Sequence, residues 1–308
     1  MKVMLYKARE SVAVLALLAL ILAPVSALCQ TVAERDMSGV AGLNISPGAA
    51  QAGAAGAFGS VATDVFSLHY NPAGSVNAGR YAVGLMHHEW IADVRSEYFA
   101  FVWKPDKVAV GVSLLYNSVG DIERRSDIPT PEPLSIFDAQ DMVAGLTAGF
   151  HISPEFSIGL TAKVIYERID VSSGTAVALD IGGYYEFLPN VHVGMAASNL
   201  GSKMKLKSQE DDLPSVVRAG GSYEYRTFRF GVDIVTPTDD QPHFHVGAEN
   251  VISDILTLRA GYASGYDIRD FAFGFGVRHE FASIDYAYTP IGSDLGDSHR
   301  FSLTLTWR

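Results

Sequence analysis

Residues 156–167 read FSIGLTAKVIYE, and their side chains alternate between two kinds. The even-numbered positions, from Phe156 to Tyr166, are apolar, whereas most odd-numbered positions between them are small or polar. Successive side chains of a β-strand point to opposite faces of the sheet. The stretch therefore predicts a long strand with one apolar face and one small, polar face.

The same period of two recurs along most of the chain after residue 79, as in VAVGVSLLYN (108–117) and FAFGFGVRHE (271–280). Fourteen candidate strands follow from it, and an even number suits a closed barrel made by a single chain. They lie near residues 79–90, 95–104, 107–118, 140–151, 155–170, 174–187, 190–199, 215–225, 227–237, 242–250, 254–264, 268–280, 282–289 and 298–308.

Two architectures fit strands of this kind. A soluble sandwich buries the apolar faces, whereas a membrane barrel turns them towards lipid and lines its lumen with small and polar side chains. The candidate strands have the length that a tilted membrane strand needs, about 9–11 residues or more. Aromatic residues near strand ends, among them Tyr81, Trp90, Tyr98, Trp103 and Tyr225, suit a membrane interface. We therefore predict an all-β fold, a 14-stranded antiparallel transmembrane β-barrel, over residues 79–308.

The connections between the candidate strands differ in length. Short ones such as PDK (105–107) and LPN (188–190) have turn chemistry. Longer polar ones cover 119–139, 200–214 and 289–297. Short turns on one rim and longer loops on the other are typical of barrels in the bacterial outer membrane, which is the predicted location.

The N-terminus has the features of a secretory signal peptide. Lys2, Lys7 and Arg9 precede an apolar run over residues 11–25, and small residues follow it. The run of about 15 residues is shorter than the roughly 20 that a membrane-spanning helix needs. We predict a cleaved signal over residues 1–27, or as far as residue 30.

Charge and cysteine content exclude some classes of protein. The chain has a net charge of −11, and the signal region, with three basic residues and Glu10, contributes +2, which leaves −13 for the remainder. An acidic surface of this kind does not bind nucleic acid, because phosphate contacts need basic side chains. Cys29 is the single cysteine, so no internal disulfide is expected.

Residues 28–78 differ from the rest of the chain. The stretch SPGAAQAGAAGAFGSVATDVFSLHYNPAG (46–74) is rich in Gly and Ala and does not alternate. A chain of small residues with a few apolar anchors suits a plug folded inside a lumen with glycine-lined walls. Within it, Asn71-Pro72 predicts a turn, because Pro72 fixes its own φ and biases Asn71 away from helix. The residues themselves leave open whether this turn only leads into the first strand or belongs to the plug.

The block GAAGAFGSVATDVFSLHYNPAGSVNAGRYAVGLMHHEW (53–90) resembles the opening of the PorV/PorQ family, part of the FadL-like group of outer-membrane barrels. Thr63 stands where an acidic residue is common in that family. The ending SDLGDSHRFSLTLTW (293–307) is similar to the family's last hairpin. The resemblance identifies a plug (or hatch) motif made of Gly56, Phe58, Asp64, Tyr70, Asn71, Pro72, Ala73 and Gly74.

This resemblance implies a function. PorV-like members serve type IX protein secretion, in which they bind or shuttle cargo with C-terminal sorting domains at the outer membrane. The partners expected are then such secreted proteins, type IX secretion components and outer-membrane lipid, around a monomeric barrel. The alternative is a FadL-like transporter for long-chain fatty acids or other hydrophobic small molecules, gated by the N-terminal hatch.

Charged residues on the small-residue faces predict a polar network inside the lumen, because buried charges need partners. Its members are Lys163, Glu167, Arg229, Asp233, Glu249, Arg259, Arg278, Glu280 and Asp285.

No catalytic, metal or cofactor site is predicted. His243 and His245 share one strand face but supply two ligands, and the adjacent His87 and His88 point to opposite faces. The chain has no Gly-x-Ser-x-Gly stretch, and the polar run at 297–299 suits the start of the last strand. We therefore predict that the protein is not an enzyme.

Overall fold

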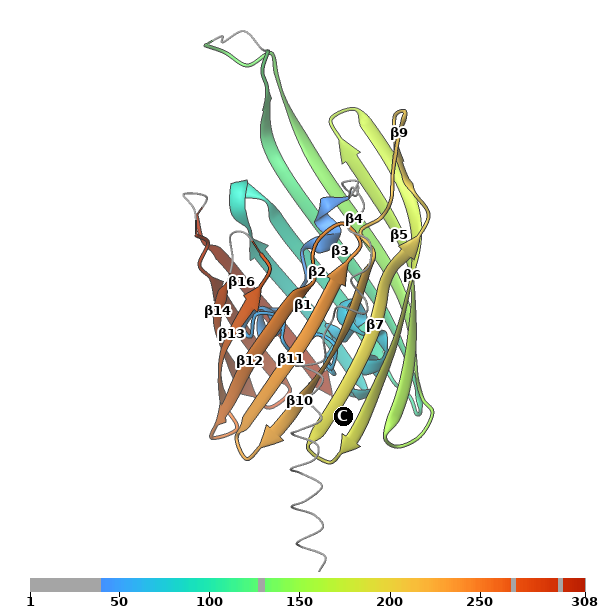
Figure 1. Ribbon diagram of the computed structural model, residues 1–308, viewed down its shortest axis with the longest axis vertical. Helices are drawn as coiled ribbons and strands as arrows, with labels where there is room; N and C mark the ends of the chain where they lie inside the picture. Colours follow the sequence, from blue (N-terminus) through green and yellow to red (C-terminus); the bar gives the residue numbers. More distant parts are fainter. Residues whose placement is uncertain (1–39, 127–130, 267–269, 293–295, 308) are drawn as a thin grey trace, which may run out of the picture.

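The computed structural model describes residues 40–126, 131–266, 270–292 and 296–307. The predicted signal peptide and residues 28–39 of the predicted plug lie outside the described residues. Figure 1 shows a tilted cylinder of antiparallel strands with a short irregular segment inside it. None of the described helices is long and apolar enough to cross a membrane.

Fourteen strands form the closed barrel, and each pairs in antiparallel fashion with its neighbours. They are β1 (Tyr81–Glu89), β2 (Arg95–Trp103), β3 (Val108–Arg124), β4 (Ser135–His151), β5 (Phe156–Ile169), β6 (Ser172–Leu188), β7 (Val191–Gly201), β10 (Val216–Tyr225), β11 (Phe228–Pro237), β12 (His243–Ile252), β13 (Leu256–Ser264), β14 (Phe271–His279), β15 (Ala282–Thr289) and β16 (Ser298–Trp307). The predicted fold class is confirmed.

The alternating pattern decides which side chains face lipid. Along the first half of β3, Val108, Val110 and Val112 are 38–41% exposed on the outer face, whereas Ala109 between them is fully buried. The barrel closes where β1 meets β16, with Tyr81 opposite Trp307. Closure pairs the first strand with the last, so the wall has no free edge along its membrane-spanning part.

The two rims of the barrel differ. One rim carries the short turns 104–107, 152–155, 189–190, 226–227, 253–255 and 280–281. The other carries the longer connections, among them 202–215 and 290–297. We assign the second rim to the cell exterior, since short turns face the periplasm in barrels of this kind. It also carries η4 (Ile91–Asp93) and the small hairpin of β8 (Met204–Leu206) and β9 (Gln209–Asp211).

The expected loop over 119–139 is corrected by the structure. β3 continues to Arg124 and β4 begins at Ser135, so much of the segment is a two-stranded ribbon that rises above the exterior rim (Figure 1). We call residues 119–124 and 135–138 the outer ribbon. Its sequence does not alternate cleanly, because a ribbon above the membrane has no lipid-facing side to keep apolar.

Candidate functional site

The described part of the plug, residues 40–78, lies inside the barrel. It contains η2 (Ala41–Asn44), α2 (Ala49–Gly53), α3 (Ser67–Tyr70) and η3 (Pro72–Asn77). α2 packs against β14 and β15, and η3 packs on the opposite wall against β4, β5 and β6. Small side chains such as Ala54, Ala57 and Ala73 are fully buried. Their size lets the chain turn several times within the width of the lumen.

Phe66 and Tyr98 show how an apolar anchor holds the plug to the wall. The ring of Phe66 stacks on Tyr98 of β2 with 5.7 Å between centroids. Tyr98 is 4% exposed and points into the lumen, so the expectation that it lies at the membrane interface is wrong. Trp90 also departs from that expectation, because it lines a cavity at the barrel mouth.

Asn71 joins two parts of the plug to the wall. α3 ends there, in extended backbone with φ −155° and ψ 102°, and η3 begins at Pro72. The Asn71 side-chain oxygen accepts a hydrogen bond from the Ala73 N–H at 3.1 Å. Its Nδ2 donates to the Ser60 carbonyl at 2.6 Å and to the Gly183 carbonyl of β6 at 3.0 Å. Asn71 therefore caps a turn and also tethers that turn to a membrane-spanning strand.

We expect Asn71→Ala to lower the free energy of unfolding by about 2–4 kcal/mol, because two buried carbonyls lose their donor. The measurement is urea unfolding of the barrel refolded in detergent micelles. Asn77→Ala is the matched control, because Asn77 ends the same helix η3 but is exposed. Equal midpoints for the two variants would show that the tether does not hold the plug.

The other residues of the predicted plug motif support the same fold. Gly56 has φ +80°, a left-handed backbone conformation that favours glycine. The Asp64 carboxylate accepts hydrogen bonds from Gln51 Nε2 at 2.7 Å and from the Phe66 N–H at 3.0 Å. Burial raises the pKa of Asp64, and these two hydrogen bonds oppose that rise. A Cβ at Gly74 would overlap the Ala62 carbonyl, so only glycine fits there.

A set of wall glycines lies against backbone and side-chain atoms of the plug, and we call it the glycine belt. Gly149, Gly159 and Gly182 lie directly opposite one another on β4, β5 and β6. Gly231, Gly247 and Gly261 do the same on β11, β12 and β13. A Cβ at any of these six positions would come within 2.7 Å of a plug atom. Glycine in a strand interior permits such close approach of another backbone.

A buried ion pair anchors the plug on a third side. Arg218 of β10 donates to Asp233 of β11 at 2.9 Å, and the exposed fractions of the two side chains are 11% and 0%. Asp233 also accepts hydrogen bonds from the N–H of Ser60, at 2.8 Å, and from its hydroxyl. The Arg218 guanidinium lies over the ring of Tyr70 at 5.2 Å, and Tyr70 donates its hydroxyl proton to the Pro47 carbonyl. The wall pair thus contacts the plug at Ser60, at Tyr70 and, through a hydrogen bond of 3.4 Å from Arg218, at the Gly56 carbonyl.

The structure brings several predicted luminal charges together. Arg259 lies 2.7 Å from Glu249 and 2.7 Å from Asp285, and Arg229 lies 3.7 Å from Glu249. Arg229 also stacks over the plug residue Phe58 at 4.6 Å. This cluster lies towards the periplasmic end of the lumen.

Lys163 and Glu167 of β5 belong to other parts of the lumen. Lys163 pairs with Asp180 of β6 at 2.6 Å and donates to Asn199 at 2.9 Å. Glu167 is 8% exposed and lies against the plug backbone at Val40.

Two of the residues that were predicted to face the lumen do not lie there in the structure. Glu280 lies in the exposed turn between β14 and β15, so it is not part of a luminal network. Arg278 is at the periplasmic end of β14 and is exposed. Both follow the alternating pattern, but that pattern does not show where a strand leaves the lumen.

Sequence reasoning missed Arg218 and Asp180, although the signal for them was present. Each stands on the same strand face as wall glycines, Arg218 beside Gly220 and Asp180 beside Gly182. Ser60 and Asn199 carry no such signal, because their roles depend on which segments meet in space.

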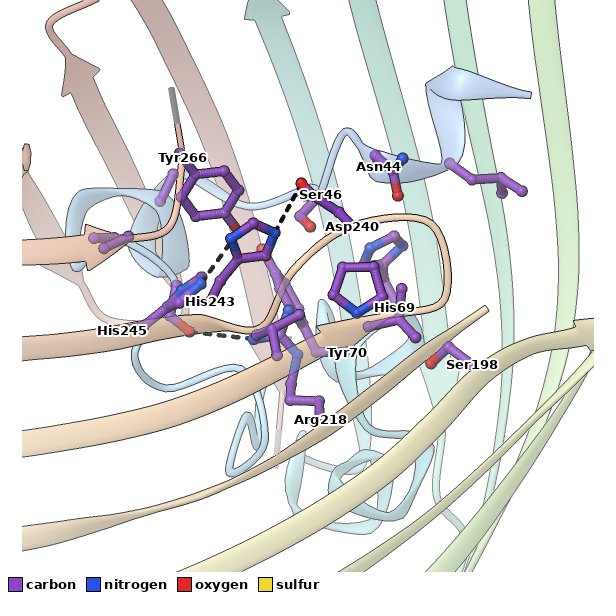
Figure 2. A pocket seen from close by; sticks show the side chains of 18 of the residues that line it. Asn44, Ser46, His69, Tyr70, Ser198, Arg218, Asp240, His243, His245 and Tyr266 are labelled. Atoms are coloured by element: carbon purple, nitrogen blue, oxygen red, sulfur yellow. Dashed lines mark hydrogen bonds and ion pairs between the residues drawn. The ribbon is translucent and has the colours of Figure 1, made fainter. Parts of the chain in front are cut away.

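A cavity of about 420 Å³ lies on the exterior side of the plug. Figure 2 shows this cavity with His69 and Tyr70 of the plug, Arg218 and His243 of the wall, and Tyr266 of the connection between β13 and β14 around it. The rings of His243 and Tyr266 stack with centroids 3.9 Å apart. Burial, together with nearby cationic side chains such as Lys163 and Arg218, holds the pKa of His69 well below its usual range. His69 is therefore a neutral polar ring at ordinary pH.

The fold and its filled lumen define an outer-membrane β-barrel whose N-terminal segment packs inside it. The chain belongs to the family described as type IX secretion system protein PorV, which matches residues 33–231. A relative named UPF0164 protein, from Treponema pallidum (strain Nichols), is 24% identical over 285 residues. That match covers 81% of this chain, and the chain spans 64% of the relative's length.

Solved structures of similar fold are channels and transporters of the FadL-like group. The CymD monoaromatic hydrocarbon channel has a TM-score of 0.64 at 12% identity, covering 85% of this chain and 97% of its own. The Ralstonia pickettii toluene transporter TbuX has a TM-score of 0.59 at 12% identity, with 83% and 98% covered. A Pseudomonas aeruginosa FadL homologue has a TM-score of 0.55 at 14% identity, with 83% and 97% covered. These likenesses concern the fold, and they agree with the predicted outer-membrane location.

Proposed function

We propose that this barrel is an accessory of type IX protein secretion that binds or shuttles cargo on its exterior surface and does not conduct it. Membership of the PorV family supports the secretion role. The observation that carries the proposal is the direct packing of the plug against the glycine belt. Plug and wall atoms in direct contact leave no gap at these six positions, which supports a role for the outer surface.

The exterior surface offers two elements for recognising a protein. The outer ribbon extends beyond the rim, and the β8–β9 hairpin extends from the connection between β7 and β10 (Figure 1). Recognition at these elements needs no catalytic residue. The partners we propose are secreted proteins with C-terminal sorting domains and components of the secretion system.

The experiment is deletion of the gene in its native host, followed by surface labelling of proteins with C-terminal sorting domains. We expect these proteins to disappear from the cell surface and to return when the intact gene is supplied. The purified barrel should also show no stable conductance in a planar lipid bilayer. Normal surface display of these proteins in the deletion strain would contradict the secretion role.

A second candidate function is transport of long-chain fatty acids or other hydrophobic small molecules. The cavity beside α3 favours it, because a ligand there would contact the plug directly. Lys163, Arg218 and Arg300 also line this cavity, which suits a molecule with a polar end better than a pure hydrocarbon. Uptake of labelled oleate by deletion and complemented strains tests this role, and equal uptake in the two strains would exclude it.

A further inference from the structure

The outer ribbon has an edge that the barrel wall does not cover. Pairing between β2 and β3 ends at Arg95 and Ser118, and β3 then continues for six more residues to Arg124. Within the described residues, no strand pairs with that side of residues 119–124. A free strand edge presents backbone N–H and C=O groups in a row and accepts another strand.

One face of the ribbon looks over the barrel mouth and carries the apolar side chains of Val119, Ile122 and Phe137, with the Arg124 guanidinium over the Phe137 ring at 5.1 Å. Asn117, just below the ribbon, donates to the Gly42 carbonyl of the plug at 3.1 Å, so its face points inward. Val119 lies opposite Ala139, and Ile122 lies opposite Phe137. The register shift between Val119 and Ile122 places Ile122 and Phe137 on that same inward face. Side chains of an added strand would therefore find apolar partners on the mouth side.

A crevice of about 570 Å³ continues from the base of this edge. Val119 and Ala139 line it on the ribbon side, and Trp90, Val94 and Tyr266 line it on the side of the neighbouring connections. An extended chain that pairs with the edge of β3 can thus bury its next apolar side chain in the crevice. The edge and the crevice form one continuous surface.

Charge decides what kind of strand fits. The ribbon carries three exposed acids, Asp121, Glu123 and Asp138, against one exposed base, Arg124, so its net charge is −2. Acidic side chains at an edge repel a second copy of the same edge. A strand with basic residues on its solvent face avoids that repulsion.

We infer that the free edge of β3 at residues 119–124 binds an extended strand of a partner protein, with apolar side chains towards the mouth and basic ones towards solvent. This inference rests on the proposed exterior role of the barrel and specifies its chemistry. The partner gains main-chain hydrogen bonds from the edge and side-chain contacts from Ile122, Phe137 and the crevice.

The test uses the barrel in lipid nanodiscs and a nine-residue probe peptide, acetyl-KVKIKVKIK-amide. Residue-resolved hydrogen exchange should show protection, when the peptide is present, of those amides of residues 119–124 that point away from β4. Protection confined to these amides is specific to strand pairing, because each N–H of a strand points to one of its two edges. Absence of protection, or protection elsewhere on the barrel only, overturns the inference.

Two controls separate strand pairing from charge attraction. The same peptide N-methylated at its central residue and at one neighbour of that residue keeps its charge but loses a donor on each edge, and it should bind about tenfold more weakly. Ile122→Ser should weaken binding of the unmodified peptide, whereas Ile136→Ser should not, because Ile136 lies on the outward face of the ribbon and is 59% exposed. Equal binding of both peptides contradicts strand pairing.

A shortened barrel distinguishes this inference from the proposed function. Replacing residues 120–138 with Asn-Gly joins Val119 to Ala139, which are already paired, through a two-residue hairpin turn. Wall pairing is kept, because β2 and β5 do not pair with the removed residues. We expect a folded, heat-modifiable barrel that no longer binds the probe or restores cargo display. Full display from this variant, in a host whose complete deletion loses display, overturns the ribbon inference and leaves the secretion role intact.

Discussion

Gly159→Val is expected to displace the plug from the wall and to open an ion path through the barrel. A Cβ at Gly159 would overlap the backbone of Pro72 and Ala73, which cannot rotate away as a flexible side chain can. Overpacking of this kind costs about 1–3 kcal/mol even where side chains can adjust. Val itself is a good strand residue, so β5 should still form and close the barrel. Either the plug shifts or the wall deforms. We expect the plug to shift, because it has fewer hydrogen bonds to lose than the paired strands of the wall.

The measurement is single-channel conductance in a planar bilayer, together with limited proteolysis of the plug. Gly183→Val is the matched control, because Gly183 belongs to the adjacent strand β6 and the nearest atom to its added Cβ is 3.8 Å away, on Phe156. We expect stable conductance and plug cleavage for Gly159→Val and neither for Gly183→Val. A closed, protease-resistant Gly159→Val barrel would show that the glycine belt does not seat the plug.

Asp233→Leu is expected to destabilise the barrel by about 3–5 kcal/mol, because it leaves Arg218 buried without its charge partner. The Asp233 side chain is 0% exposed and that of Arg218 is 11% exposed, so water replaces the lost partner poorly. The variant also removes the acceptor for both hydrogen bonds from Ser60 of the plug. We therefore expect the plug to loosen together with the wall.

Urea unfolding in detergent micelles measures the loss, and a double variant tests its cause. Arg218→Leu combined with Asp233→Leu should recover a large part of the stability, because no unpaired charge then remains. Arg124→Ala serves as the exposed comparison. Its pair with Asp170 spans 2.9 Å, but the side chains are 50% and 28% exposed, so a loss below about 1 kcal/mol is expected. A double variant less stable than Asp233→Leu would contradict the explanation.

The barrel could be predicted from the sequence because the alternation of side chains along each strand indicates its two faces. In β5, the apolar positions from Phe156 to Tyr166 show the lipid-facing side without reference to any other segment. The same pattern placed Lys163 on the luminal side, where the structure has it. The pattern failed where it met the ends of strands, as at Glu280, and above the membrane, as in the outer ribbon.

The sequence predicted which types of residue make up the candidate site, but it did not predict which of them contact one another. A Gly- and Ala-rich stretch next to glycine-containing strands indicated a plug against a glycine-lined wall. It did not indicate that Asn71 reaches Gly183, which is 112 residues away, or that Ser60 reaches Asp233, which is 173 residues away. Arg218 was missed although its strand face was readable and its partner, Asp233, was itself predicted to face the lumen.

The sequence by itself therefore determined the class of fold, the lipid-facing and luminal sides of the strands, and the unusual character of residues 28–78. These depend on the direction of a side chain along its own strand, which the period of two sets locally. Only the tertiary structure decided which wall glycines meet the plug, which buried charges pair, and where β3 leaves the wall as a free edge. Those features depend on strand register and barrel closure, since a slip of one residue would turn every luminal side chain of a strand to the lipid.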